Sequence, residues 1–378
     1  MQKTYQICKK CVMDTSDEDI HFDIDGVCNY CHNNKLREQR TNAIVLSKEQ
    51  QLSNVIAEIK KSGTNKQYDC IIGLSGGVDS SYVAYIIKKM GLRPLAIHVD
   101  NGWNSELAVK NIENIVKKLD IDLYTYVVDW EEFKSIQRAY FKASVVDIEV
   151  VTDNAIFVIL NRMTQKYKVK YFLSGFNATT EGIMPASWFY SDKMDSANIK
   201  DIYSKFGEGL KLKTFPLFSF LEYWKWKFKI DYVKEVSILN LINYDKENAK
   251  ELLKKELGWQ DYGTKHGESV FTKFYQNYIL PQKFSIDKRR AFFTSLIWAK
   301  QILREEALKQ LESPTYTVQS LVEDKEYIMK KLSFSDSEFE EILKNKPKKH
   351  SDFKSYNKTY KDLVNLSKKL GLYTILKK

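Results

Sequence analysis

The sequence of 378 residues lacks any apolar run that approaches the roughly 18 residues of a membrane-spanning helix. Its first residues, Met1 to Tyr5, contain no apolar core of the kind that a secretory signal needs. We therefore expect a soluble, cytoplasmic protein with no membrane partner. Internal repeats and low-complexity tracts are also missing, and the hydrophobic content of 43% excludes a disordered chain. The length is enough for two or three domains.

Cysteine is scarce as well, and four of the five cysteines form two Cys-x-x-Cys pairs. Paired thiolates at this separation bind tetrahedral Zn²⁺, and a structural site of this kind leaves no open position for chemistry. A disulfide is disfavoured in a cytoplasmic chain, and a redox Cys-x-x-Cys does not come in twos without a βαβ context. We expect His32 to be a neighbour of the metal and not a ligand. The predicted zinc ligands are Cys8, Cys11, Cys28 and Cys31.

One glycine-rich loop lies between a predicted strand and a predicted helix, which is the context of a phosphate site. It lacks the lysine of a Walker A motif, since Asp79 stands directly before Ser80. The apolar run Cys70 to Leu74 predicts a buried parallel strand, and an apolar helical pattern follows the loop. Two glycines let the backbone approach an anion, and the helix start offers unpaired amides. A glycine-rich turn without a ligand is the alternative. We predict a phosphate cradle formed by Leu74, Ser75, Gly76, Gly77, Val78, Asp79, Ser80 and Ser81.

Strand and helix patterns alternate from the cradle onward. Further strands are predicted at 93–100, 123–128 and 171–175, with helices at 106–119 and 152–167 between them. Four strands alternating with helices predict an α/β fold with a doubly wound parallel sheet. We assign residues 1–40 to a zinc-binding ribbon, with a hairpin turn at Asp25-Gly26, and 41–66 to a linker helix. The sheet domain spans 67–224, and a mostly helical C-terminal region spans 225–378, with helices at 245–257, 290–311, 318–332 and 335–344.

Polar residues follow the predicted strands at the edge where a doubly wound sheet binds ligands. For any one of these residues, capping of a loop is the alternative explanation. Their convergence is the evidence for a site: His98, Asp100 and Asn101 follow the second strand, Asp129 the third, and Gly175, Asn177, Thr179 and Glu181 the fourth.

The net charge of +10 permits a nucleic-acid or anionic-metabolite partner, but the lysines are scattered and the charge alone decides nothing. The basic segment 283–290 is either a solvated face or a basic rim for an anionic substrate.

Four segments in this order resemble the PseA- and WbpG-like N-acetyl sugar amidotransferases of the N-type ATP pyrophosphatase (PP-loop) superfamily. They are Ile7 to Thr15, Asp25 to Cys31, Ser75 to Ser80 and Phe284 to Arg290. The resemblance implies an adenine nucleotide alpha hydrolase-like fold and the cofactors ATP, Mg²⁺ and Zn²⁺. It also implies a role in bacterial surface glycans, such as pseudaminic acid in flagellin glycosylation or sugars of lipopolysaccharide.

The implied reaction converts a sugar N-acetyl group to an acetamidino group through an adenylylated intermediate, releasing AMP and pyrophosphate. The implied substrate is an acetamido sugar that is anionic or nucleotide-linked. The resemblance further implies that ammonia comes from a separate glutaminase with a channel subunit.

Carried onto this sequence, the resemblance assigns the serines and amides of 75–81 to pyrophosphate and Asp79 to Mg²⁺. Residues His98 and Val99 then lie where the family places adenine and ribose, and Gly175 and Asn177 lie beside the α-phosphate. Beyond Asp79, the catalytic candidates are Asp100 and Glu181, which would bind metal or deprotonate ammonia.

The main alternative is a tRNA-modifying enzyme of the same superfamily. Sulfur transfer is disfavoured because the one cysteine outside the zinc quartet, Cys70, lies inside a strand. A zinc-ribbon binding module with an inactive nucleotide fold is a further alternative, and the intact Asp79 argues against it. We expect a nucleic-acid partner to be unlikely.

Overall fold

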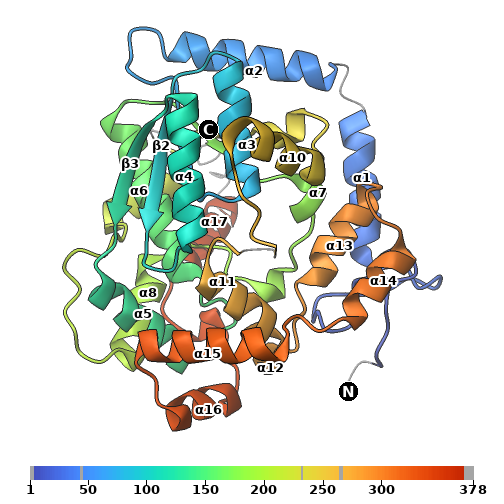
Figure 1. The fold of residues 1–378 in the computed structure, drawn as a ribbon. Coiled ribbons are helices and arrows are strands. Elements are labelled where there is room, and N and C mark those ends of the chain that lie inside the picture. Colours follow the sequence, from blue (N-terminus) through green and yellow to red (C-terminus); the bar gives the residue numbers. More distant parts are fainter. Residues whose placement is uncertain (1–3, 43–45, 231–232, 264–266, 370–378) are drawn as a thin grey trace.

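The protein is described here by a computed structural model that covers residues 4–42, 46–230, 233–263 and 267–369. Parts of the predicted linker (43–45) and of the predicted C-terminal region (370–378) thus lie outside the described residues. Five strands form a parallel sheet in the order β3-β2-β1-β4-β5. Figure 1 shows helices around this sheet, of which β2 and β3 are labelled. The strands are β1 (Cys70–Gly73), β2 (Pro94–Asp100), β3 (Asp122–Val127), β4 (Tyr171–Ser174) and β5 (Lys234–Ser237).

The α/β fold with a parallel sheet is confirmed, and so are the four predicted strands. Sequence analysis missed β5, a short edge strand that pairs with β4. The sheet therefore extends past the boundary placed at residue 224. The chain moves outward from β1 to β3 and then returns to the other side of β1, so the strand order reverses between β1 and β4. Ligands of such sheets bind at this reversal.

Helices cover both faces of the sheet, which explains why its central strands are apolar on both sides. Ile72 packs in one core with α2 (Lys48–Ser62), α3 (Val78–Lys89), α4 (Glu106–Leu119) and α10 (Lys246–Leu257). Ile71 points to the opposite face and packs with α6 (Val150–Lys166). A separate core joins the N-terminal residues to the C-terminal helices.

Local capping sets several helix boundaries. Ser47 and Gln50 form a capping box at the start of α2, and Ser335 and Glu338 form another before α16 (Asp336–Lys344). The predicted single helix over 290–311 is wrong, because the chain forms α13 (Arg289–Trp298) and α14 (Arg304–Glu312). Lys300 lies between them with a φ of +59°, a left-handed conformation that ends a right-handed helix.

Other helices were not assigned from the sequence, or were assigned only in part. α5 (Trp130–Ala143) buries several polar side chains, which obscures its apolar stripe. The helices α11 (Val270–Phe274) and α12 (Leu280–Phe284) are joined through a π-helical turn, Tyr275–Ile279. The remaining helices of this group are α1 (Asn29–Asn42), α7 (Ala178–Glu181), α8 (Ser196–Phe206), α9 (Phe220–Lys227) and α17 (Tyr356–Lys369). By contrast, α15 (Val318–Leu332) has the bounds that the sequence predicts.

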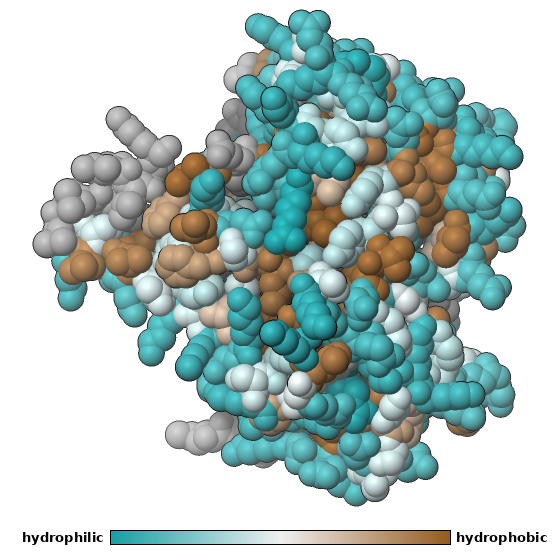
Figure 2. Space-filling model, turned by 90° about the vertical axis from the view of Figure 1, so that its left-hand side faces the viewer, coloured by the Kyte–Doolittle hydropathy of each residue, from teal (hydrophilic) through white to brown (hydrophobic). Residues whose placement is uncertain are grey.

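The surface is mostly hydrophilic on the face that Figure 2 shows, with hydrophobic residues in separate areas. Within the described residues, no helix combines the length and apolarity that crossing a bilayer requires.

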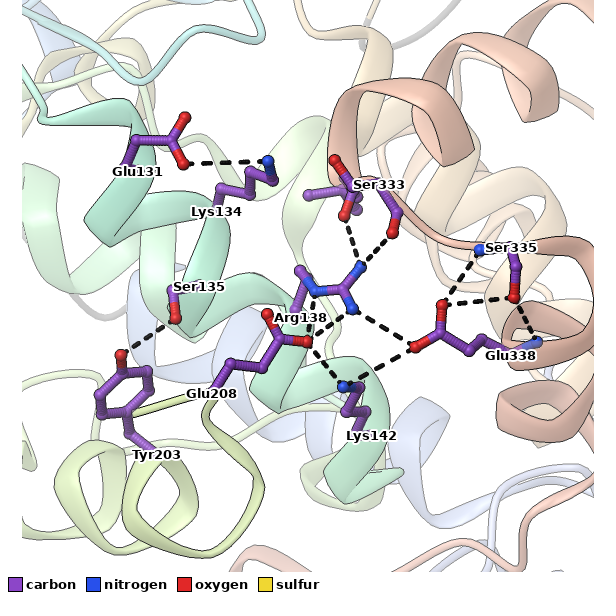
Figure 3. A network of polar contacts seen from close by, with 11 residues as sticks. Glu131, Lys134, Ser135, Arg138, Lys142, Tyr203, Glu208, Ser333, Ser335 and Glu338 are labelled. Carbon is purple, nitrogen blue, oxygen red and sulfur yellow. Dashed lines mark hydrogen bonds and ion pairs between the residues drawn. The ribbon is translucent and has the colours of Figure 1, made fainter. Parts of the chain in front are cut away.

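An ion-pair network centred on Arg138 of α5 connects elements that are distant in the sequence (Figure 3). The guanidinium donates to the carbonyl oxygens of Leu332 and Ser333, both at 2.6 Å, and to the carboxylate of Glu208, also at 2.6 Å. Glu338 lies 3.4 Å from the same group. Only 8% of the Arg138 side chain is exposed, so its charge depends on these partners.

This network predicts acid-sensitive stability. Hydrogen bonds from Arg138 lower the pKa of Glu208 to about 2, from an ordinary value of about 4.3. A carboxylate with a lowered folded-state pKa stabilises the fold above its unfolded pKa and loses that contribution as the pH falls toward 2. We expect Glu208→Gln to lower the free energy of unfolding at pH 7 by less than about 1 kcal/mol, because 46% of the side chain is exposed.

Urea denaturation at pH 7 and at pH 3 checks this expectation. The loss of stability between the two pH values should be smaller in Glu208→Gln than in the wild type. The matched control is Glu251→Gln, since that side chain is 75% exposed. An equal loss in the wild type and in Glu208→Gln would contradict the assignment.

Candidate active site

The loop between β1 and α3 has the geometry of an anion cradle. Gly76 has a φ of +81°, and a Cβ there would lie 2.7 Å from the Ala108 carbonyl oxygen, so glycine is required for both reasons. Its own carbonyl accepts hydrogen bonds from Trp259 Nε1 at 2.8 Å and from Tyr262 Oη at 2.7 Å. These two donors fix the turn, and the first-turn amides of α3, which have no intrahelical partners, follow it directly.

The predicted cradle residues have two roles. Some place polar groups at the loop, and the others hold the loop and the helix start in place. Ser75 and Ser80 place their hydroxyl oxygens 3.2 Å apart at the loop. Ser81 is buried and donates to the Gly77 carbonyl at 2.7 Å, so its hydroxyl supports the helix start. The side chains of Leu74 and Val78 pack in the core.

Asp79, in the first turn of α3, has three polar neighbours. Its carboxylate accepts a short hydrogen bond from Tyr244 Oη and one from Asn177 Nδ2 at 3.4 Å, and Lys246 Nζ lies 3.8 Å away. Burial, followed by the charge of Asp79, raises the pKa of Tyr244, which keeps the phenol a donor. The side chain of Asp79 is still 26% exposed. It is therefore oriented but accessible.

The turn after β4 lies against the cradle. A Cβ on Gly175 would stand 3.1 Å from the Ser80 amide nitrogen, which explains the glycine by close approach. Asn177 is fully buried and accepts from the Thr180 amide at 2.9 Å as the N-cap of α7. Through its bond to Asp79, Asn177 positions that carboxylate. Thr179 lies on α7, which ends at Glu181.

The end of β2 is also tied to the cradle. Nδ1 of His98 lies 3.0 Å from the Leu74 carbonyl oxygen, which accepts only, and Asn104 Nδ2 lies 3.2 Å from Nε2. Burial lowers the pKa of His98, so a neutral ring donates from Nδ1. Asp100 accepts from the Gly102 amide at 2.9 Å and from Asn104 at 3.1 Å. Asp100 thus holds the turn after β2.

Two adjoining cavities lie along this edge of the sheet. The phosphate cavity, about 700 Å³, is lined by the cradle and by Asp79, Lys246 and Lys250. The strand-edge cavity, about 640 Å³, is lined by the ends of β1, β2 and β4, including His98, Val99 and Asn101. Asp100 and Asn177 line neither, and Asp129 instead caps α5. Six residues line both cavities: Ser75, Phe176, Thr180, Glu181, Glu268 and Phe292.

Several site residues were missed by sequence analysis. The strand-edge cavity also receives Glu149, whose pKa is raised by burial, together with Gln276 and Lys288. Gln276 Nε2 donates to Glu149 at 3.2 Å. Sequence analysis also missed Trp259, Tyr262 and Glu268, because they come from the C-terminal region and no local spacing connects them to the cradle.

The four predicted zinc ligands come together near the N-terminus. Their sulfur atoms all lie within 4.8 Å of one another, with Cys8 and Cys31 at 3.9 Å and Cys11 and Cys28 at 3.7 Å. Tetrahedral zinc with Zn–S bonds of about 2.3 Å requires sulfur separations of roughly 3.8 Å. The donor set therefore fits a closed, structural Zn²⁺ site. Nε2 of His32 lies 2.7 Å from Asp23 Oδ2, as expected for a neighbour.

The N-terminal segment with the four cysteines is held by C-terminal helices, and in Figure 1 α13 and α14 lie beside this segment. Arg304 of α14 donates to the carbonyls of Cys8 at 2.8 Å and Cys11 at 3.1 Å. Val12 is fully buried and packs with Phe293 and Ala307.

The basic segment 283–290 is neither a solvated face nor a continuous basic rim. Lys283 donates to the carbonyls of Ile342 and Asn345 at the end of α16. Arg289 pairs with Asp287 at 2.8 Å, and Arg290 pairs with Asp14 of the N-terminal module at 2.9 Å. Lys288 lines the strand-edge cavity. Most of these cations therefore connect parts of the fold.

Comparisons with known proteins agree with this geometry. Residues 46–180 match the family described as NAD synthase, and residues 268–368 match the family described as LPS biosynthesis protein WbpG-like, C-terminal domain. A stretch of 64 residues is 33% identical to a tRNA(Ile)-lysidine synthase of Chlamydia pneumoniae. That match covers 16% of this chain and about a fifth (20%) of the curated relative.

Two solved structures are similar at low identity. The NH3-dependent NAD synthetase from Campylobacter jejuni is 16% identical, with a TM-score of 0.29, over 42% of this chain and 73% of that one. The NMN synthetase from Francisella tularensis is 18% identical, with a TM-score of 0.30, over 61% and 94%. The family matches and the cradle support the same assignment. The family matches thus identify in this chain a PP-loop domain of the NAD synthase type, at residues 46–180, and a WbpG-like C-terminal domain, at residues 268–368.

Proposed function

We propose that this chain is an ATP-dependent amidotransferase that converts the N-acetyl group of a bacterial surface-glycan sugar to an acetamidino group. The observation that carries the proposal is the PP-loop cradle, with Asp79 in the phosphate cavity and a second cavity that shares its wall. The match of residues 268–368 to a WbpG-like domain supports the glycan context.

The first step is activation of the amide oxygen. The N-acetyl oxygen attacks the α-phosphorus of ATP, the bond between the α-phosphorus and the bridging oxygen breaks, and pyrophosphate leaves into the cradle. Ser75, Ser80 and the first-turn amides of α3 hold the leaving pyrophosphate, whose charge the helix start also favours.

The carboxylates of Asp79 and Glu181 line the phosphate cavity and fit Mg²⁺, which takes hard oxygen ligands. When bound, Mg²⁺ neutralises charge on the phosphates and aligns them.

The second step releases AMP. Ammonia attacks the activated carbon, loses a proton to a nearby acceptor, and the carbon–oxygen bond to AMP breaks. Overall, the amide and ammonia give an amidine and the elements of water, which are consumed in splitting ATP into AMP and pyrophosphate. The amide oxygen therefore ends in AMP.

This oxygen transfer gives the decisive experiment. The chain is incubated with ATP, an ammonium salt and an acetamido sugar, free or nucleotide-linked, whose acetyl oxygen is ¹⁸O. We expect one ¹⁸O atom per AMP by mass spectrometry, with pyrophosphate formed in equal amount. Formation of ADP and orthophosphate, or of unlabelled AMP together with amidine, would refute the mechanism.

Modification of tRNA is the second candidate function, and the match to a tRNA(Ile)-lysidine synthase favours it. That match involves 64 residues, or 16% of this chain, whereas the WbpG-like match extends over residues 268–368 and supports the glycan function. ATP/pyrophosphate exchange separates the two, since we expect acetamido sugars to stimulate it and unmodified tRNA to have no effect.

The nitrogen source can be predicted from Cys70. A glutaminase needs an activated nucleophilic cysteine, but Cys70 is fully buried in β1, and burial raises the pKa of its thiol. We expect the purified chain to use ammonium and to release no glutamate from glutamine until a separate glutaminase is added. Glutamate release is measured with ATP, sugar and glutamine. Release by the chain alone that disappears in Cys70→Ala would contradict this expectation.

A further inference from the structure

We infer that Glu268, supplied by the WbpG-like C-terminal domain, is a ligand of the metal that accompanies the nucleotide phosphates. The inference rests on the proposed ATP function and adds a residue to its site. No pattern around the loop suggests Glu268, because it follows Asp79 by almost 190 positions.

The backbone of Glu268 is fixed beside the nucleotide site. Its carbonyl accepts from the Ser105 amide at 2.9 Å, and the Val270 amide donates to the Trp103 carbonyl at 3.2 Å. Between these bonds, Ser269 forms an antiparallel bridge with Asn104. Three consecutive residues of the C-terminal domain thus pair with the turn that follows β2. The fold therefore fixes the backbone position from which the Glu268 side chain extends.

The carboxylate of Glu268 reaches the cradle. Its Cδ and Oε1 atoms lie 3.6 Å from the position that a Cβ on Gly77 would take. Gly77 is the N-cap of α3, so the carboxylate lies at the helix start where phosphate oxygens are expected. Glu268 and Glu181 are the two acidic residues among the six that line both cavities. They stand where the two cavities meet.

The charge of this carboxylate determines its role. A negative side chain beside a triphosphate repels it, unless a cation lies between the two and binds both. Mg²⁺ is commonly held by one or two carboxylates together with substrate phosphates. Among the cradle residues 74–81, Asp79 supplies one such group. Glu268 provides a further carboxylate that lines the same cavity.

A binding experiment tests this role without catalysis. The affinity for α,β-methylene-ATP, which cannot release pyrophosphate, is measured by calorimetry in excess MgCl₂ and again in EDTA. In Glu268→Gln, we expect the affinity with Mg²⁺ to fall about tenfold and the affinity in EDTA to rise severalfold. Glu268→Asp, which keeps the charge on a shorter side chain, should lose part of the affinity with Mg²⁺ and gain none in EDTA.

Glu251→Gln is the charge-matched control. Glu251 is 75% exposed on α10 and lines neither cavity, so both affinities should stay unchanged. In Glu268→Gln, a lower affinity with Mg²⁺ together with a higher affinity in EDTA would support the inference. A change of the same sign in both conditions, or no change, would overturn it. If the wild-type chain bound the analogue in neither condition, the ATP function itself would fail, which is a distinguishable result.

Discussion

Replacing Asp79 with alanine is expected to lower the rate of AMP and pyrophosphate formation by about 1,000-fold or more. Asp79 is the acidic residue within the cradle, and the groups around it orient it without closing it off. In the proposed mechanism, losing this carboxylate removes a ligand of Mg²⁺, so charge that builds up as pyrophosphate leaves is no longer neutralised. The rate of AMP release, measured by chromatography at saturating ATP, checks the expectation.

Two further variants separate charge from position. Asp79→Asn keeps the size of the side chain and an acceptor for Tyr244 but loses the charge, so we expect nearly the same loss. Tyr244→Phe removes the phenol donor and leaves the carboxylate, so a smaller loss is expected, on the order of tenfold. Thermal melting monitors folding in all variants. If Asp79→Ala kept more than a tenth of the wild-type rate, Asp79 would have no direct role with the metal.

Sequence analysis located the part of the site that is local in the chain. The strand, glycine turn and helix start of the cradle lie within about 20 residues, so their apolar runs and glycines are visible in one window. The same holds for the paired cysteines. In each case the physical cause acts over a few neighbouring residues.

Residues that act through tertiary contacts were not predictable in this way. Trp259 and Tyr262 fix the Gly76 carbonyl from more than 180 positions away, and Glu268 approaches Gly77 from a similar distance. The role of the basic segment 283–290 was likewise undecided, because Arg290 has its acidic partner in the N-terminal module. A sequence window shows such a cation but not the carboxylate or carbonyl that binds it.

Replacing Cys28 with serine is expected to remove zinc and to loosen much more than the first 40 residues. The binding energy of a structural zinc site is also folding energy, and apparent values are on the order of 10 kcal/mol. The fully buried Cys28 belongs to the same core as residues of the C-terminal helices, and Arg304 binds the backbone of the cysteine knuckle. We therefore expect α13 and α14 to lose support when the knuckle unfolds.

Metal analysis and hydrogen exchange test the two parts of this prediction. Zinc should be present at one ion per wild-type chain and absent from Cys28→Ser, and amide protection should fall in α13 and α14 as well as near the N-terminus. Protection of α3, in a different core, should change little. Arg304→Met is the informative partner variant. It keeps all four cysteines, so it should retain zinc while weakening protection of α14.

Retention of zinc by Cys28→Ser would refute the ligand assignment. Loss of zinc with unchanged protection in α13 and α14 would instead show that the contacts of Arg304 and Val12 do not couple the module to the C-terminal domain. Coupling matters for the active site, because α13 follows Lys288 and carries Phe292, both of which line the strand-edge cavity. If the two are coupled, a zinc site without chemistry of its own would still influence the strand-edge cavity of the proposed active site.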